Sequence, residues 1–184
     1  MKSLIVNLIA GPGAGKSTIA AKIFSILKEN NMSCELVREF AKELTWKKDF
    51  VTLSDQVYVS ATQNHRQYEV DGQVDVIVTD SPIILGILYY NEPNKNVKKY
   101  FSKFLIEKFK EQNNLVVYIK RTKPYVSAGR NQSESEAIEI DIKTRKLLED
   151  NWIPYIEIDG DKKAANKIVK LIQERIKEKA WPKK

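Results

Sequence analysis

Residues 4–18 read LIVNLIAGPGAGKST, and this stretch decides the fold. Its first six residues carry no charge, which predicts a short strand buried on both faces. Three glycines and a proline within residues 11–15 predict a tight turn. From residue 16 to residue 30, apolar side chains recur at helical spacing, which predicts a helix with one buried face. A strand, a glycine-rich turn and a helix are therefore expected in immediate succession.

The turn fits the relaxed form of the phosphate-binding P-loop, with Ala10 where the strict pattern has its first glycine. Glycines allow successive backbone N–H groups to point at one phosphate, and the N-terminus of the next helix adds partial positive charge. Lys16 is expected to reach the β- and γ-phosphates of a nucleotide, and Ser17 to ligate Mg²⁺. The expected nucleotide-binding residues are Gly11, Gly13, Ala14, Gly15, Lys16, Ser17 and Thr18.

Strands and helices alternate along the rest of the chain. Four further strands are expected, at residues 34–37, 74–78, 115–119 and 155–158. Further helices are expected at residues 41–46, 54–70, 97–109, 133–150 and 163–179. This alternation predicts an α/β fold, with a five-stranded parallel sheet and helices on both faces, in the three-layer arrangement of P-loop NTPases. We expect one domain over residues 1–184.

Two of the expected helices carry apolar stripes. The helix at residues 54–70 is expected to use one face, made by Val57, Tyr58, Ala61, His65 and Tyr68. The helix at residues 97–109 is expected to pack through Val97, Phe101, Phe104, Leu105, Lys108 and Phe109. The helix at residues 133–150 opens with Ser133 and Glu136 three positions apart, which is the spacing of a capping box.

The composition excludes several classes of site. Cys34 is the single cysteine and His65 the single histidine, so an intramolecular disulfide, a cysteine-ligated zinc site and a histidine-cluster metal site are excluded. The longest apolar run, residues 83–90, is far shorter than the roughly 20 residues that a membrane-spanning helix needs. We expect a soluble, cytoplasmic protein with no membrane partner, and a homodimer is left open.

The formal net charge of +7 is concentrated at one end of the sequence. Residues 162–184 hold eight lysines and one arginine against two glutamates, so the rest of the chain is neutral. A basic C-terminal helix has two readings: attraction to nucleic acid or another polyanion, or a lysine-rich face turned to solvent.

Acidic residues follow two of the expected strands. Because ligands of parallel α/β sheets bind at the carboxyl ends of the strands, residues there are candidates for function. Glu39 follows the strand at 34–37 and is a candidate general base, or else an acidic residue that stabilises a helix start. Arg38 binds the charge of an acceptor in one reading and pairs with a carboxylate in the other. Asp80 follows the third strand and is the expected Mg²⁺ anchor.

The helix at residues 54–70 should form one wall of an acceptor pocket. Gln63 can donate and accept hydrogen bonds together, as recognition of a nucleobase or carboxamide requires. Tyr58 and His65 are candidates for stacking on a ring, and Arg66 is a further candidate substrate contact. Ordinary packing and surface exposure remain the alternative for each residue alone.

A polar loop at residues 121–132 contains Arg121 and Arg130 and is expected to act as a mobile lid. A closing loop with arginine donors stabilises a phosphoryl-transfer transition state and excludes water, which favours a kinase over the alternative of a solvated basic loop. Gly160 lies in the turn after the fifth strand, where backbone groups often approach a nucleobase. The guanine-specific Asn-Lys-x-Asp pattern of GTPases is missing.

Taken together, these residues resemble a P-loop small-molecule kinase of the nucleoside and nucleotide kinase type. More narrowly, the chain resembles the nicotinamide riboside kinase domain of NadR-like proteins and stand-alone phage and bacterial chains with an AAA-type domain. The resemblance spans nearly the whole chain and rests on residues 11–18, 37–41, 63, 79–81 and 129–132, running into Glu134, Glu136 and Asp141. Only the P-loop is highly specific.

The resemblance implies ATP- and Mg²⁺-dependent phosphorylation of a nucleoside-like hydroxyl, the acceptor being a small nucleoside or nucleotide. By this analogy Glu39 is the base, Asp80 positions Mg²⁺ and Gln63 meets the base of the acceptor, while Arg121 and Arg130 are lid arginines. Full NadR proteins carry adenylyltransferase and DNA-binding extensions with no counterpart in these residues, so the resemblance does not fix the acceptor.

Two other functions remain open at this point. A kinase acting on nucleic acid, for example on a hydroxymethylated base or a strand end, requires an open cleft continuous with the basic C-terminal helix. A nucleotide-binding regulatory NTPase predicts slow hydrolysis that does not depend on any acceptor.

Overall fold

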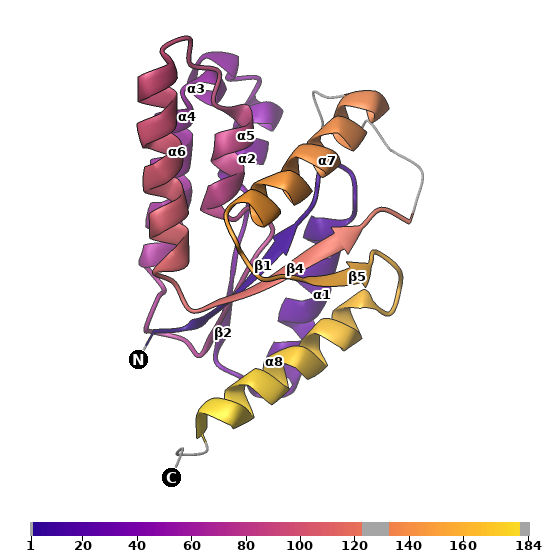
Figure 1. The fold of residues 1–184 in the computed structure, drawn as a ribbon. Coiled ribbons are helices and arrows are strands. Elements are labelled where there is room, and N and C mark those ends of the chain that lie inside the picture. The colour runs from indigo at the N-terminus through magenta and orange to yellow at the C-terminus, as the bar shows by residue number, and fades with distance from the viewer. Residues whose placement is uncertain (1, 123–132, 181–184) are drawn as a thin grey trace.

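A central parallel sheet organises the molecule (Figure 1). The computed structural model describes residues 2–122 and 133–180, with side chains described as far as residue 177. The five strands lie in the order β2-β3-β1-β4-β5, and every pair is parallel. Their bounds are β1 Leu4–Ile9, β2 Cys34–Val37, β3 Val76–Thr79, β4 Asn114–Lys120 and β5 Ile156–Asp159. The predicted five-stranded parallel α/β sheet is confirmed.

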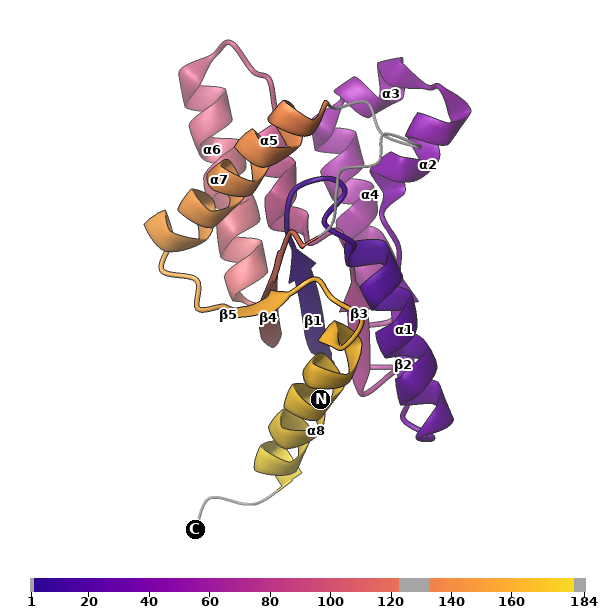
Figure 2. The ribbon, with the colours of Figure 1, turned by 90° about the vertical axis from the view of Figure 1, so that its right-hand side faces the viewer.

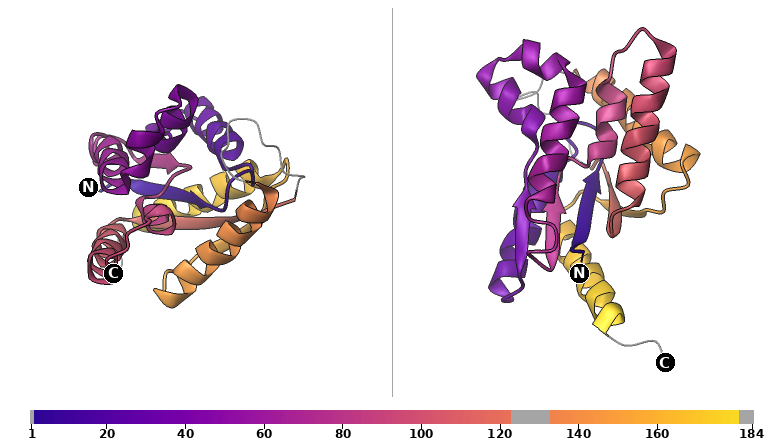
Figure 3. Two further views of the ribbon diagram at one scale, coloured as in Figure 1. Left: turned by 90° about the horizontal axis from the view of Figure 1, so that it is seen from above. Right: turned by 90° about the vertical axis from the view of Figure 1, so that its left-hand side faces the viewer.

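Helices cover both faces of this sheet, as the alternation predicted. One face carries α1 and α8, while η1, α6 and α7 pack on the other (Figures 2 and 3). The helices are α1 Lys16–Glu29, α2 Phe40–Lys47, α3 Phe50–Ser54, α4 Gln56–Tyr68, the 3-10 turn η1 Ile83–Leu85, α5 Gly86–Tyr89, α6 Lys95–Lys110, α7 Glu134–Asp150 and α8 Ala164–Ala180.

Strand β1 lies in the middle of the sheet and is buried along its whole length. Leu4, Val6 and Leu8 pack into the cluster formed with α1 and α8, because alternate side chains of a strand point to the same face. Ile9 packs into the opposite cluster, with η1, α6 and α7. This double burial explains the uncharged sequence of the strand.

Helix α4 buries a different face from the one that the apolar pattern predicted. Its buried residues are Gln56, Val59, Ser60, Gln63 and Gln67. Of the predicted stripe, Val57 and Tyr58 are each 50% exposed and Tyr68 is 76% exposed. The stripe was wrong because this helix turns a mostly polar face toward a cavity and α2, so apolar periodicity does not mark its buried side.

The region before α4 also differs from expectation. The predicted helix at residues 54–70 is present as α4, and an unpredicted short helix, α3, precedes it, because Asp49 and Asp55 each cap a new N-terminus. The carboxylate of Asp49 accepts a hydrogen bond from the backbone of Thr52, and that of Asp55 from the backbone of Tyr58. Residues 83–89, which the sequence marked only as an apolar run, form η1 and α5.

Helix α6 buries only part of its predicted stripe. Leu105 and Phe109 are buried, but Val97 and Phe104 are 44% and 59% exposed. By contrast, the capping box at Ser133 and Glu136 is present at the start of α7, as predicted. No helix among residues 2–122 and 133–180 is long and apolar enough to span a membrane.

Candidate active site

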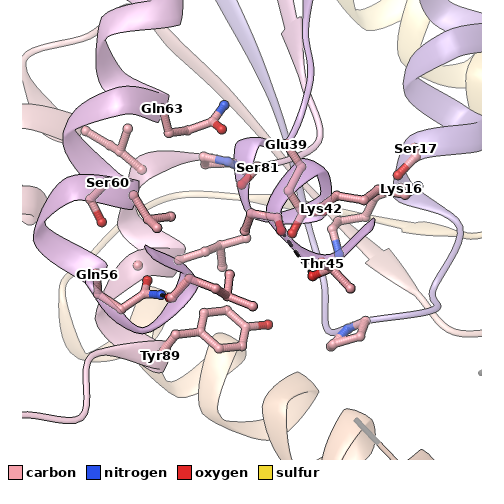
Figure 4. A pocket seen from close by; sticks show the side chains of 18 of the residues that line it. Lys16, Ser17, Glu39, Lys42, Thr45, Gln56, Ser60, Gln63, Ser81 and Tyr89 are labelled. Carbon is pink, nitrogen blue, oxygen red and sulfur yellow. Dashed lines mark hydrogen bonds between the residues drawn. The ribbon is translucent and has the colours of Figure 1, made fainter. Parts of the chain in front are cut away.

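A cavity of about 510 Å³ opens beyond the carboxyl ends of β1, β2 and β3. The loop at residues 10–15 and the start of α1 form one side of it, and residues from α2 to α5 form the other. Figure 4 shows side chains of both sides: Lys16 and Ser17 from the loop and α1, Glu39, Lys42 and Thr45 around α2, and Gln56, Ser60 and Gln63 from α4.

The loop has the backbone conformation that its glycines permit. Gly13 and Gly15 have φ values of 80° and 98°, which side-chain-bearing residues rarely adopt. Gly15 is the N-cap of α1, where no side chain caps the helix and no acidic residue lies in the first turn. Backbone N–H groups and the positive end of the helix dipole therefore face an incoming anion.

Lys16 lies deep in the loop. Its Nζ donates hydrogen bonds to the carbonyl oxygens of Ala10 and Gly11, at 2.8 and 3.0 Å. Burial lowers the pKa of its ammonium group, because a low-dielectric environment disfavours charge. Three carboxylates oppose that shift, those of Glu39, Asp80 and Asp141. The predicted phosphate-binding lysine thus lies among acidic groups from three separate segments.

Glu39 and Asp80 are coupled through the backbone. Glu39 is the N-cap residue of α2 and lines the cavity. Its backbone N–H donates to Oδ1 of Asp80 at 3.1 Å. Asp80 is 4% exposed at the end of β3, so a carboxylate predicted as a metal anchor also fixes the first turn of α2.

Gln63 holds the backbone on either side of Glu39. Its Oε1 accepts a hydrogen bond from the N–H of Phe40 at 2.9 Å, and its Nε2 donates to the carbonyl of Arg38 at 3.4 Å. The side chain is 5% exposed and contributes to the cavity lining. Its amide therefore fixes the turn that presents Glu39.

Arg121 follows β4 and Gly160 follows β5, and both approach the P-loop from that side of β1. Nη2 of Arg121 donates to the carbonyl oxygen of Pro12 at 2.8 Å. A Cβ on Gly160 would lie 2.9 Å from the carbonyl oxygen of Lys120 and 3.0 Å from that of Ala14, so only glycine fits there without displacement. Arg130 and most of the predicted lid lie outside the described residues.

A family model described as an AAA domain matches residues 5–164. The chain belongs to this AAA domain family. Among solved structures it is similar to one described as NadR protein in complex with NR, with a TM-score of 0.67 and 14% sequence identity. That match covers 94% of this chain and 51% of the other, so the chain spans about half the length of the NadR chain. None of the curated proteins compared with the chain matches it.

These comparisons confirm the P-loop fold and the AAA-type resemblance that the sequence indicated. At 14% identity the likeness to NadR shows a shared fold, and one fold serves many functions. The chemistry of this AAA domain must therefore be argued from its own cavity.

Three of the predicted acceptor contacts do not line the cavity of the AAA domain. Arg38 is exposed, and Tyr58 is half exposed on the outer side of α4. Arg66 makes a bidentate pair with Glu43, at 2.7 and 2.9 Å, and its guanidinium lies 4.7 Å from the ring centroid of Phe40. The Arg66 side chain therefore braces α2 against α4, because Glu43 and Phe40 lie on α2.

His65 is also directed away from the cavity. Its side chain is 69% exposed, and Nε2 lies 3.6 Å from a carboxylate oxygen of Glu69. This pair lies on one helix at positions four apart, so the single histidine of the chain has an ordinary surface environment.

Several cavity residues were missed by the sequence reasoning. They lie on the acceptor side of the cavity, and all except the lysine are neutral: Lys42, Thr45, Ser54, Gln56, Ser60, Tyr89 and Asn91. Lys42 and Thr45 lie three and six residues after Glu39, a helical spacing that could have identified them. Tyr89 is 40% exposed as a whole residue, but local desolvation of its hydroxyl raises the pKa, and the carboxylates of Glu39 and Asp141 act in the same direction. Tyr89 therefore stays neutral and can donate a hydrogen bond.

The donor set fits a nucleotide together with Mg²⁺ better than it fits a metal alone. Among the side chains of the described residues, no group of three or more His, Cys, Asp or Glu could hold a metal ion. Ser17 lines the cavity at the start of α1, and Asp80 lies at the neighbouring strand end. Mg²⁺ normally takes only one or two protein oxygens together with phosphates and water, which matches so small a set.

Proposed function

We propose that the protein is an ATP- and Mg²⁺-dependent kinase that transfers the γ-phosphate to a hydroxyl of a small nucleoside-type acceptor. One observation carries the proposal: a single cavity joins the P-loop to a second, largely neutral compartment, and Glu39 lines it. A phosphate-binding loop alone would serve any NTPase. A compartment beyond it that includes a carboxylate provides room for a second substrate and a base for its hydroxyl.

Each part of the cavity has a role in this reaction. The backbone N–H groups of the loop and Lys16 bind and orient the phosphates. Ser17 in the cavity lining and Asp80 at the end of β3 would hold Mg²⁺, which would supply charge neutralisation at the phosphates. A carboxylate oxygen of Glu39 accepts the proton of the acceptor hydroxyl as the hydroxyl oxygen forms its bond to the γ-phosphorus. The bond between the γ-phosphorus and the β,γ-bridging oxygen breaks, and ADP leaves.

The chemistry of the acceptor compartment supports a nucleoside more than a nucleotide. Lys16 and Lys42 are the cations among the described residues that line the cavity, and Lys16 belongs to the P-loop. An acceptor phosphate is usually recognised by arginine forks, and the arginines at positions 38 and 66 are directed elsewhere. Neutral groups such as Gln56, Ser60 and Tyr89 suit hydroxyls and a base.

Apolar side chains complete the acceptor compartment and suit a flat ring. Phe50, Leu53, Val59, Ile83 and Leu85 line it together with the neutral polar groups. A pocket that combines apolar side chains with a few placed polar groups is typical of small-molecule sites. Nicotinamide riboside, which the sequence resemblance implies, combines such a ring with sugar hydroxyls, and the NadR structure was solved with NR.

The two alternative functions receive less support from the geometry. α8 starts after β5 and runs toward the opposite end of the sheet from the P-loop (Figure 2). Its lysines are therefore not continuous with the acceptor compartment, as a nucleic-acid kinase of the kind considered would require. A regulatory NTPase has no use for a compartment of this size next to Glu39.

A substrate screen tests the proposed function. The protein is incubated with ATP, Mg²⁺ and one of four acceptor classes: nucleosides, nucleoside monophosphates, nicotinamide riboside or hydroxymethylated DNA. We expect ADP release that depends on a nucleoside and is lost in Lys16→Ala. ADP release that requires DNA, or that is equal without any acceptor, would replace the proposal by the corresponding alternative.

A further inference from the structure

Asp141 on α7 binds the P-loop and Arg121 at the same time. Its Oδ1 accepts a hydrogen bond from the backbone N–H of Gly11 at 2.5 Å. Its Oδ2 accepts from Nε and Nη2 of Arg121, at 3.0 and 2.8 Å. Arg121 in turn donates to the carbonyl of Pro12. One carboxylate and one guanidinium thus tie three segments of the chain together.

The contact between α7 and the P-loop is as close as backbone atoms allow. A Cβ on Gly11 would lie 2.6 Å from the carbonyl oxygen of Ala137 and 2.7 Å from Oδ1 of Asp141. Ala137 is fully buried at this point. Gly11 is therefore required because helix α7 packs directly on the loop, in addition to any contact with phosphate.

Helix α7 is itself anchored to the sheet near Asp141. The hydroxyl of Tyr118 on β4 donates to the backbone carbonyl of Asp141 at 3.2 Å. One turn further along, the guanidinium of Arg145 lies 4.6 Å from the centroid of the Tyr118 ring and pairs with Glu157 on β5. The position of the Asp141 carboxylate is thus set by β4 and β5.

Both members of the pair are largely shielded from water. The side chains of Arg121 and Asp141 are 15% and 17% exposed. A shielded pair with a bidentate geometry is held more tightly than an exposed one, since both partners are charged and aligned. Neutralising Asp141 would leave the largely shielded Arg121 guanidinium without this counter-charge, which is costly.

We propose that Asp141 is a positioning residue of the nucleotide site. It holds the first N–H of the P-loop and the guanidinium of Arg121 in place, so that a triphosphate meets a cradle that is already formed. The inference rests on the proposed binding of ATP at this loop. It predicts that loss of the carboxylate weakens nucleotide binding and leaves acceptor binding unchanged.

Calorimetric titration of ATP and ADP into the full chain, without acceptor, tests the inference. Asp141→Asn keeps an oxygen for Gly11 but cannot accept from Arg121 on its nitrogen, so the Kd for ATP should rise about tenfold. Asp141→Ala loses both contacts and should raise that Kd by roughly 100-fold. Glu139→Gln is the matched control, because it removes an exposed carboxylate of the same helix.

Steady-state kinetics separate positioning from a general loss of structure. We expect the KM for ATP to rise in both Asp141 variants while the KM for the acceptor stays within a factor of two or so. Equal changes in both constants, or ATP binding as tight as or tighter than in the unaltered chain, would overturn the inference. If the unaltered chain binds no ATP, both the proposed function and the inference about Asp141 fail. If the unaltered chain and Asp141→Ala bind ATP equally well, only the inference about Asp141 fails.

Discussion

The two walls of the cavity are built from different parts of the chain. The phosphate wall is mostly backbone, turned inward by glycines at positions 13 and 15 and by the start of α1. The acceptor wall is mostly side chains, contributed by α2, α3, α4 and α5. A backbone site requires glycines at fixed positions and is visible in the sequence. A side-chain site can be built in many ways and leaves no comparable signature.

The difference extends to how each wall is kept in place. The P-loop is held by α7 through Gly11 and Asp141, close to the sheet. The acceptor wall is held by hydrogen bonds and ion pairs between helices, such as Gln63 with the α2 turn and Arg66 with Glu43. We therefore expect substitutions at the first wall to affect ATP, and substitutions at the second to affect the acceptor step.

The largest expected effect is that of Lys16→Ala. Phosphate transfer should be abolished, because the ammonium group that reaches the phosphates is removed. The fold should remain, as judged by circular dichroism and thermal unfolding. Lys22→Ala, an exposed lysine on the same helix, is the matched control. Normal turnover in Lys16→Ala would show that phosphate transfer does not depend on the P-loop lysine, which contradicts the proposed reaction.

Glu39→Gln has the next largest expected effect, and it tests the residue that lies between the phosphate wall and the acceptor wall. If Glu39 is the general base, kcat should fall about 10²–10⁴-fold while the affinity for ATP changes little. The amide is isosteric with the carboxylate, so the α2 turn held by Asp80 and Gln63 is preserved. An unchanged rate would assign Glu39 to structure or to metal positioning.

Gln63→Ala distinguishes two roles for one residue. The sequence resemblance implies a contact with the base of the acceptor, whereas both ends of the amide bind the backbone around Glu39. If the backbone role dominates, kcat should fall by about tenfold with little change in acceptor KM, because the Glu39 carboxylate, the proposed general base, is displaced. A rise in acceptor KM that differs between nucleosides would instead support the direct contact.

The sequence predicted what depends on local pattern. The P-loop, the five strands and the capping box at Ser133 all follow from residues within a few positions of one another. The prediction of the buried face of α4 was wrong, because Gln56, Gln63 and Gln67 are buried while Val57 and Tyr58 are half exposed. Apolar periodicity finds the side of a helix that meets a core, and this helix meets a polar cavity and an α2 turn instead.

Contacts between distant segments were beyond any local pattern. Asp141 lies 130 residues after Gly11, and nothing in either neighbourhood indicates that they meet. The sequence placed Asp141 only among the acidic residues that follow the expected lid. The pairing with Arg121 follows only once the sheet order places β4 beside β1.

Gly160→Ala tests the contact between the turn after β5 and the P-loop, and its expected effect on activity is smaller than that of the preceding variants. The added Cβ would lie within 3.0 Å of two carbonyl oxygens, so the turn after β5 must move away from the P-loop. We expect the free energy of unfolding to fall by about 1–3 kcal/mol, measured by urea denaturation, and the KM for ATP to rise. Unchanged stability together with unchanged KM would show that the turn moves freely and does not support the loop.

The smallest effect concerns the frame of the acceptor wall. The hydrogen bond from Arg66 lowers the pKa of Glu43 below its ordinary value of 4.5, with the guanidinium charge as a further cause. Because the folded state favours the ionised carboxylate, the pair stabilises the protein at neutral pH, and this contribution is lost as the pH falls through the lowered pKa. About a third of each side chain is exposed, so solvent screening keeps the contribution to about 0.2–1 kcal/mol.

Glu43→Gln measures that contribution directly. Its free energy of unfolding should be lower than that of the unaltered chain at pH 7, and the difference should shrink as the pH falls below 4.5. Glu69→Gln, at the C-cap of α4, is the control, since that carboxylate is more exposed and lies beside His65. A difference that persists unchanged at low pH would mean that Glu43 stabilises the acceptor wall through packing and not through its charge.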